Sequence, residues 1–181
     1  MSMSHASTAV RPLSVSDPRH AEATDFFHYE AELLDDLEER TWLRELVSRD
    51  IVYRVPVRET VERARGRGFA ESSFHLDETY GSLDSRVTRG ETRYAWAEDP
   101  PSRILHFVTN IRVRPSDDED LLDARSNILI FRTRQDQTSA KLLSGERHDV
   151  LRREDGRWRL LRRVVLLDLT VIGTHNFSLF F

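Results

Sequence analysis

The chain begins its regular patterning with apolar residues at helical spacing. Asp17 and Pro18 form a typical helix start, because an aspartate accepts hydrogen bonds from free backbone N–H groups and proline suits the first helical position. The residues that then share one helical face are Phe26, Phe27, Glu30, Ala31, Leu33 and Leu34. A second amphipathic run places Trp42, Leu43 and Leu46 on one side. The pattern predicts two helices, the second short and packed beside the first.

The middle of the chain has a weaker pattern. Over residues 51–57, successive side chains alternate between two faces, which predicts a strand. Because this run contains Pro56, we expect the strand to tolerate an edge position. Residues 58–70 are polar and predict a loop. A helix is expected over residues 77–89.

The C-terminal half alternates with the period of two that half-buried strands show. Strands are expected over 105–113 and 122–130, and the Asp155-Gly156 turn joins two further strands over 148–153 and 157–169. Gly145 is a candidate bulge site. Helices followed by a long antiparallel meander predict an α+β domain shaped like a cone, with a curved sheet wrapped around the helices.

The last long strand is apolar on both faces. One side carries Trp158, Leu160, Val164 and Leu166, and the other carries Leu161, Val165, Leu167, Leu169 and Val171. The chain's own helices can cover one face, so we expect another subunit to cover the second face. The stretch from Phe177 to Phe181, with three phenylalanines, supports an oligomer. The alternative is that this tail and a bent sheet close the domain's own core.

Composition narrows the class of protein. The chain has 181 residues and 21.2 kDa, with 39% hydrophobic and 32% charged residues, which fits one globular domain. We expect a flexible arm over residues 1–17 and a single domain over 18–181. No cysteine is present, which excludes disulfides, thiolate zinc sites and iron–sulfur ligation by this chain. The net charge of −4 argues against nucleic-acid partners, and no apolar segment is long enough for a membrane or a signal peptide, so the cytoplasm is the expected location.

Two weak patterns could carry chemistry. His75 and Asp77 have a spacing that, with a distant His106 or His148, could bind a ferrous ion, although Asp77 would serve equally as a helix cap.

His106 and Asn110 lie on one predicted strand and could supply a general base and an oxyanion donor inside a cone. Tyr53, Asp77 or Asp168 could assist them. The simpler interpretation is a buried, hydrogen-bonded polar cluster.

Arginines cluster around the Asp155-Gly156 turn. They are Arg152, Arg153, Arg157, Arg159, Arg162 and Arg163. Because Glu154 and Asp155 are interleaved with them, we expect a salt-bridged face or a subunit contact rather than a nucleic-acid patch.

Several short stretches together resemble one family. They are Tyr29-Glu30-Ala31-Glu32-Leu33-Leu34-Asp35, Asp77-Glu78-Thr79, Trp96-Ala97-Glu98-Asp99-Pro100-Pro101-Ser102-Arg103, Val108-Thr109-Asn110, Ser144-Gly145-Glu146-Arg147-His148-Asp149-Val150-Leu151-Arg152-Arg153, Leu166-Leu167-Asp168 and Asn176-Phe177-Ser178-Leu179-Phe180-Phe181. These stretches occur in the same order in the beta, or small, subunit of Rieske-type aromatic-ring-hydroxylating dioxygenases. The sequence resembles that family, in particular its biphenyl, benzene and phenylpropionate-like branch. Residues 1–17 lie outside the resemblance.

The resemblance implies a nuclear-transport-factor-2-like cone and a trimer of these subunits beneath three catalytic alpha subunits. It places the [2Fe-2S] Rieske cluster and the mononuclear Fe(II) in the alpha chain, so this chain would have no catalytic, cofactor-binding or metal-binding residues. NADH would supply electrons through a reductase and a ferredoxin, and the product would be a cis-dihydrodiol.

Two other functions stay open from the residues alone. One is a free-standing isomerase or dehydratase of the same fold, and the other is a binding module for an apolar ligand. An open apolar cone would favour the binding module, whereas an interior filled by Phe, Leu and Trp side chains would favour the structural subunit.

Overall fold

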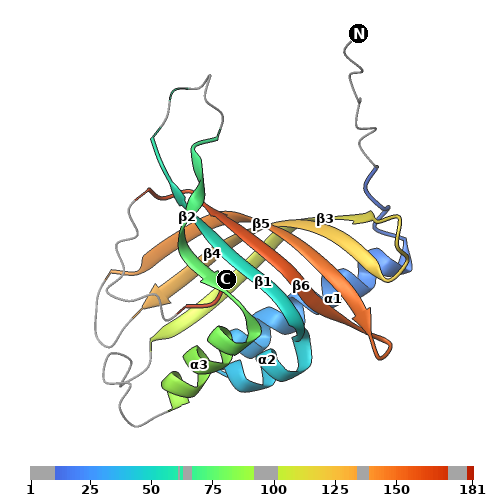
Figure 1. Ribbon diagram of the computed structural model, residues 1–181, viewed down its shortest axis with the longest axis horizontal. Coiled ribbons are helices and arrows are strands. Elements are labelled where there is room, and N and C mark those ends of the chain that lie inside the picture. Colours follow the sequence, from blue (N-terminus) through green and yellow to red (C-terminus); the bar gives the residue numbers. More distant parts are fainter. Residues whose placement is uncertain (1–10, 61, 63–66, 92–101, 134–138, 171–178) are drawn as a thin grey trace.

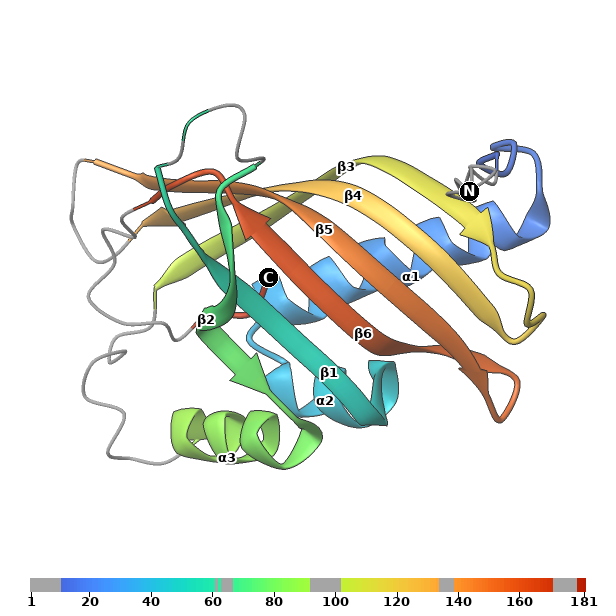
Figure 2. The same cartoon turned by 45° about the horizontal axis from the view of Figure 1, so that its top comes forward.

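A long helix lies against the inner side of a strongly curved six-stranded sheet (Figure 1, Figure 2). The computed structural model describes residues 11–60, 62, 67–91, 102–133, 139–170 and 179–181. The elements are α1 (Pro18–Asp35), α2 (Glu39–Leu46), β1 (Val47–Arg58), β2 (Phe69–Glu78), α3 (Tyr80–Glu91), β3 (Arg103–Pro115), β4 (Leu121–Thr133), β5 (Lys141–Glu154) and β6 (Arg157–Leu167). The α+β class and the curved sheet predicted from the sequence are confirmed.

The sheet order is β2-β1-β6-β5-β4-β3. Strands β3 to β6 form the predicted antiparallel meander, and β1 joins β6 in parallel. Pro56 lies at a register shift between β1 and β2, so this proline is accommodated in a strand that is not at the sheet edge.

The helices begin and end for local reasons. The Asp17 carboxylate accepts the Arg19 backbone N–H and Pro18 is the first residue of α1, as predicted. Helix α2 runs directly into β1, because its C-cap Val47 already has extended backbone angles. Residue Leu13, in the predicted arm, donates its backbone N–H to Val113 in β3.

The prediction for the middle of the chain is wrong in two respects. Residues 69–78 form β2, where we expected the end of a loop and the start of a helix. Asp77 therefore does not cap a helix; instead, the Ser82 hydroxyl accepts the Thr79 backbone N–H at the start of α3. The alternation in β2 is irregular because its pairing with β1 is bulged, and this hides the strand from pattern analysis.

Bulges also change which side chains face inward. Val150 pairs with Arg162 and Leu151 with Leu160, so Leu161 is the extra residue of a bulge in β6. The side chains of β6 that face the interior are therefore Trp158 and Leu160 before the bulge, and Arg163, Val165 and Leu167 after it. This shift explains part of the two-sided apolar pattern of this strand. Val171 lies outside the described residues.

Gly145 is not a bulge site, because β5 pairs in regular register on both sides of it. Its role is a close approach between strands. A Cβ atom at this position would lie 2.8 Å from the Leu166 backbone oxygen, so only glycine fits without moving backbone.

Candidate functional site

The interior of the cone contains a cluster of buried charges. Glu30 comes from α1, Arg147 and Asp149 from β5, and Arg163 from β6. Arg163 donates to both Glu30 carboxylate oxygens, at 2.9 and 2.8 Å, and to both Asp149 oxygens, at 2.9 and 3.0 Å. Arg147 Nη1 adds a third bond to Glu30 at 3.1 Å. Two carboxylates and two guanidinium groups thus neutralise one another away from water.

The electrostatics of the cluster favour the ionised carboxylate. Burial opposes ionisation of Glu30, but the charges of Arg163 and Arg147 outweigh it and hold the pKa of Glu30 below its ordinary value of 4.5. The Trp42 indole N–H also donates to Glu30, at 3.0 Å. The cluster is therefore a fixed ion-pair network that ties α1 to β5 and β6.

One nitrogen of the cluster has no hydrogen-bond partner among the described residues. This atom is Nη2 of Arg147. The guanidinium carbon of Arg147 lies 5.1 Å from the centroid of the Phe27 ring, so the aromatic face supplies a cation–π contact instead.

The segment Leu179–Phe181 occupies the same interior and is buried. Phe181 donates its backbone N–H to the Tyr53 hydroxyl at 2.7 Å, and its carbonyl oxygen accepts from Tyr53 and Arg163. The Phe180 ring lies 4.7 Å from the Trp42 ring. Residues 179–181 therefore give no support to an oligomer; the alternative, that the tail closes the domain's own core, is correct for them. Phe177 lies outside the described residues.

His106 connects α1 to this segment. Its Nδ1 lies 2.6 Å from the Asp35 carboxylate, its Nε2 lies 3.0 Å from the Phe180 carbonyl oxygen, and Asp35 also accepts the His106 backbone N–H. One ring nitrogen thus faces a carboxylate of α1 and the other faces a backbone carbonyl oxygen of the Leu179–Phe181 segment.

The proposed partners of a general-base site do not meet His106. Asn110 has a positive φ of 54° at a bulge in β3 and is exposed. The Tyr53 hydroxyl bonds with Phe181, and exposed Asp168 binds Arg58 and Ser144. The interpretation of a buried, hydrogen-bonded polar cluster fits His106.

The candidate metal ligands are also dispersed. His75 and Asp77 lie on β2 and His106 on β3, which are opposite edges of the sheet, and His148 pairs with Glu146 on β5. Asp77 binds Arg54 at 2.8 Å. Among the described residues, no group of three or more His, Asp or Glu side chains is arranged to hold a metal ion.

Three of the six clustered arginines form the expected salt-bridged surface. Arg152 binds Asp50 and Glu154, Arg153 binds Glu22, and Arg159 lies 3.5 Å from Glu154. Arg163 instead turns inward because of the β6 bulge.

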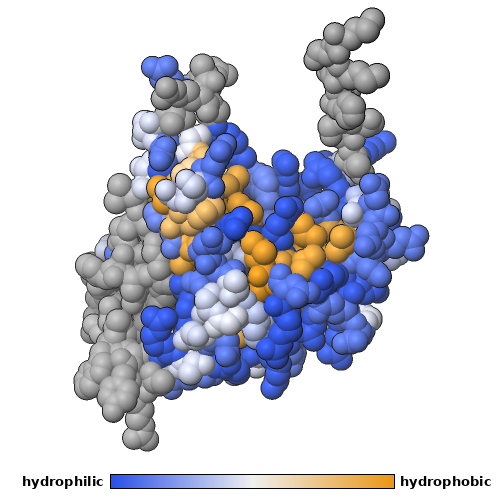
Figure 3. Space-filling view, viewed as in Figure 1, coloured by the Kyte–Doolittle hydropathy of each residue, from blue (hydrophilic) through white to orange (hydrophobic). Residues whose placement is uncertain are grey.

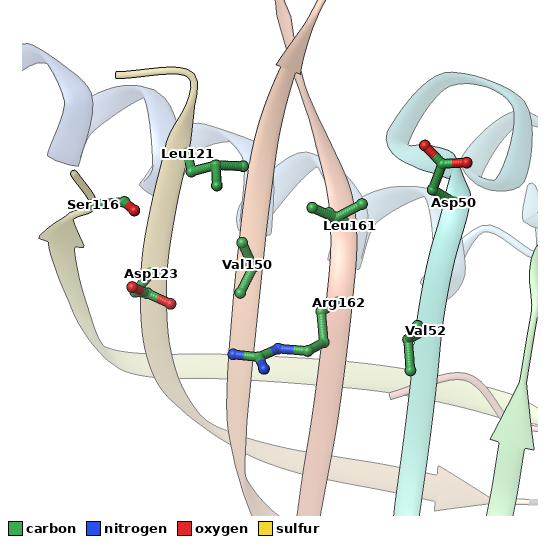
Figure 4. Close-up of a pocket in the computed structure, with 8 residues that line it drawn as sticks. All are labelled: Asp50, Val52, Ser116, Leu121, Asp123, Val150, Leu161 and Arg162. Carbon is green, nitrogen blue, oxygen red and sulfur yellow. The ribbon is translucent and has the colours of Figure 1, made fainter. Parts of the chain in front are cut away.

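The outer face of the sheet carries apolar side chains between charged ones, as the space-filling view shows (Figure 3). A shallow hollow of about 390 Å³ lies on this face, and Figure 4 shows its apolar side chains on neighbouring strands β4, β5, β6 and β1. They are Leu121, Val150, Leu161 and Val52. A second group, which we call the outer apolar patch, comprises Leu105, Phe107, Leu129, Phe131 and Leu142. Phe107 is 51% exposed and Leu142 is 56% exposed.

The buried charge cluster was not predicted from the sequence, although a signal was present. Glu30 stands on the same helical face as Phe26, Phe27, Leu33 and Leu34, and a charged residue on a buried face requires a buried partner. The partner positions could not be found without the bulge that turns Arg163 inward.

The curved sheet with α1 along its inner side defines a cone-shaped, nuclear-transport-factor-2-like protein. Residues 29–174 match the family model described as the ring hydroxylating beta subunit, and the chain belongs to that family. It is the beta subunit of an aromatic-ring-hydroxylating dioxygenase, an oxidoreductase complex.

Solved structures agree with this assignment. A chain of naphthalene 1,2-dioxygenase, solved with indole bound in the active site, is 28% identical with a TM-score of 0.82, over 94% of this chain and 90% of that chain. The beta subunit of benzoate 1,2-dioxygenase from Burkholderia mallei is 20% identical with a TM-score of 0.67, over 86% and 93%. A scytalone dehydratase candidate from Novosphingobium aromaticivorans, 13% identical with a TM-score of 0.61 over 83% and 85%, shares the fold.

Within the described part of the chain, no helix combines the length and the apolar character that crossing a bilayer requires.

Proposed function

We propose that this chain is a structural subunit that supports catalytic alpha subunits in a three-plus-three complex and has no catalytic residue of its own. The alpha subunits would hold the Rieske cluster and the mononuclear iron, and they would add both atoms of dioxygen to an arene to give a cis-dihydrodiol. NADH would supply electrons through a reductase and usually a ferredoxin. The complex would act in aromatic catabolism in the cytoplasm, with a substrate of the biphenyl, benzene or phenylpropionate type.

The observation that carries the structural role is the filled interior of the cone. A free-standing dehydratase or a binding module of this fold needs an accessible interior with free polar groups. Here Leu179–Phe181 occupies the interior, and the polar groups of Tyr53, His106 and Arg163 bind it.

The outer apolar patch supports a contact with a second copy of this chain. Its side chains adjoin one another across three strands, because Phe107 pairs with Leu129 and Phe131 with Leu142. An exposed apolar group of this kind marks protein contacts.

Charge complementarity also favours a second copy. Arg112 lies directly opposite Arg125 across β3 and β4, and neither forms an ion pair with a described residue. Opposed like charges are unfavourable unless other charges compensate them. Residues 117–120 form an exposed acidic turn, so a neighbouring copy arranged head to tail in a ring could place its turn near these arginines.

Native mass spectrometry tests the proposed assembly. The chain is expressed alone and together with the large-subunit gene beside it, and iron is measured in each purified sample. The proposal expects no iron in the chain alone and a three-plus-three complex whose iron scales with the large subunit. A chain that refuses the partner, and alone isomerises or dehydrates a small substrate, would instead support the free-standing enzyme.

A further inference from the structure

Side chains from four separate elements bind the backbone of the segment Leu179–Phe181. The carbonyl oxygen of Leu179 accepts from Arg86 of α3 at 3.4 Å, and that of Phe180 lies 3.0 Å from His106 of β3. Phe181 exchanges two hydrogen bonds with the Tyr53 hydroxyl of β1, and its carbonyl oxygen also accepts from Arg163 of β6. Ligand-binding sites in proteins have this arrangement, in which a few polar groups converge on the ligand from a preformed, mostly apolar wall.

Both aromatic side chains of the segment are buried in the interior of the cone. The Phe180 ring packs against the Trp42 ring. The guanidinium carbon of Arg86 lies 5.3 Å from the centroid of the Phe180 ring and makes a cation–π contact with it. Phe181 is 1% exposed.

The wall of this site is held in place without the segment. Arg163 is fixed by Glu30 and Asp149, and the Trp42 indole is fixed by Glu30. Asp35 likewise orients the His106 ring through Nδ1. Groups anchored by other partners keep their orientation when a ligand leaves, which is the requirement for a preorganised site.

We infer that the interior of the cone is a binding site for a short apolar peptide with adjacent aromatic side chains, and that Leu179–Phe181 is its resident ligand. The inference goes beyond the proposed function, since it concerns contacts within this chain and does not depend on a catalytic partner. Attachment to the same chain gives the segment a high effective concentration and keeps competing ligands out.

A variant that ends at Ser178 tests the inference. Isothermal titration calorimetry is carried out with N-acetyl-Leu-Phe-Phe as the probe. We expect one-to-one binding to the shortened chain and no binding to the full chain, whose site is occupied. N-acetyl-Leu-Ala-Ala is the matched control and should not bind. In the shortened chain, Tyr53→Phe should lower the affinity for the peptide by roughly tenfold, because it removes the hydroxyl that forms two hydrogen bonds with Phe181.

Equal binding of the peptide to the full and shortened chains would overturn the inference, because the peptide would then bind elsewhere. Failure of a folded, shortened chain to bind would overturn it as well. If the shortened chain is unfolded, the peptide should shift it toward the folded state, because a ligand of the native state stabilises that state.

A second variant keeps the backbone of the segment in place. Phe180→Ala in the full chain leaves a ring-sized space beside Trp42. Benzene should then raise the unfolding temperature of this variant, as apolar cavities of this kind bind it, and should not raise that of the unaltered chain. Phe107→Ala, which removes an exposed ring, is the control. No benzene effect on Phe180→Ala would contradict a ligand-shaped apolar wall around this ring.

Discussion

Arg163 of β6 binds both carboxylate oxygens of Glu30 of α1, at 2.9 and 2.8 Å, in an interior where neither side chain reaches solvent. The pair connects the long helix to the sheet at the centre of the cone. Because Arg163 also binds the carbonyl oxygen of Phe181, the same group holds the segment that fills the interior. Stability and closure of the cone therefore depend on one cluster.

Replacing Glu30 should destabilise the fold strongly. Glu30→Gln leaves Arg147 and Arg163 with one anion between them, and breaking a buried pair in this way costs about 3–5 kcal/mol of unfolding free energy. Urea unfolding followed by circular dichroism measures the loss. Glu32→Gln on the exposed side of α1 is the matched control, with an expected change within about 0.5 kcal/mol. Equal effects of the two variants would show that the buried charge is not important for stability.

The same cluster predicts sensitivity to acid. The pKa of Glu30 is lower in the folded chain than its ordinary value of 4.5, so its stabilising contribution is complete above about pH 4.5 and is lost as the pH falls toward the folded-state pKa. Unfolding free energies of the unaltered chain and Glu30→Gln should therefore converge as the pH falls below 4.5. A constant difference between pH 7 and pH 3 would contradict this linkage.

Tyr53 predicts a separate effect at alkaline pH. Burial raises the pKa of the Tyr53 hydroxyl from 10.0 to about 12. The neutral hydroxyl contributes stability that is complete below pH 10 and is lost as the pH rises from 10 toward 12. Burial also raises the pKa of Tyr29, so ultraviolet titration of the four tyrosines should show more than one late group, of which the one near pH 12 is absent in Tyr53→Phe. A group near pH 12 that persists in Tyr53→Phe would assign this titration to another tyrosine.

Gly145 predicts a strong effect of a single methyl group. Gly145→Ala places Cβ 2.8 Å from the Leu166 backbone oxygen and 3.2 Å from the Leu167 Cα, and two paired strands must separate to accept it. We expect a loss of about 1–3 kcal/mol of unfolding free energy. Gly81→Ala in α3 is the control, since nothing outside its own helix turn lies within 4 Å of the position that the added methyl group would take, and it should stabilise by about 0.4–1 kcal/mol. A neutral Gly145→Ala would show that the strands are not so close in solution.

The outer apolar patch predicts a defect in association without a defect in folding. Phe107→Glu puts a charge on a ring that is 51% exposed, so the isolated fold should tolerate it while contact with a second copy is lost. Light scattering after size-exclusion chromatography should show monomers with an unchanged circular dichroism spectrum. Val15→Glu, at another exposed apolar residue, should leave the oligomer intact. An intact oligomer in Phe107→Glu would exclude this patch as the contact.

The sequence predicted the parts of the fold that depend on regular periodicity. Phe26 and Phe27 on α1 and Trp42 on α2 followed the helical pattern, and the Asp155-Gly156 turn identified the β5–β6 hairpin. The irregular parts were hidden because pairing, rather than local pattern, determines them. The bulge at Leu161 changes which side chains of β6 face the interior, and no neighbouring residue type predicts this bulge.

The candidate site was only partly predictable for the same reason. Residue type identified His106 as a polar group on a strand, but its partners Asp35 and Phe180 lie 71 and 74 positions away. Whether a Phe-rich segment turns inward or meets a partner depends on the shape of the interior, which a one-dimensional pattern does not contain.

The most direct test of the structural role is the turnover of the assembled complex with altered interior residues. His106→Asn and Tyr53→Phe are each introduced into this chain, the complex with the catalytic subunit is purified, and formation of cis-dihydrodiol is measured per iron atom. A purely structural role predicts the same turnover per iron as the unaltered complex, with any loss confined to the yield of complex. Loss of turnover in a complex that keeps its full stoichiometry and iron would contradict it, because a residue of this chain would then take part in catalysis.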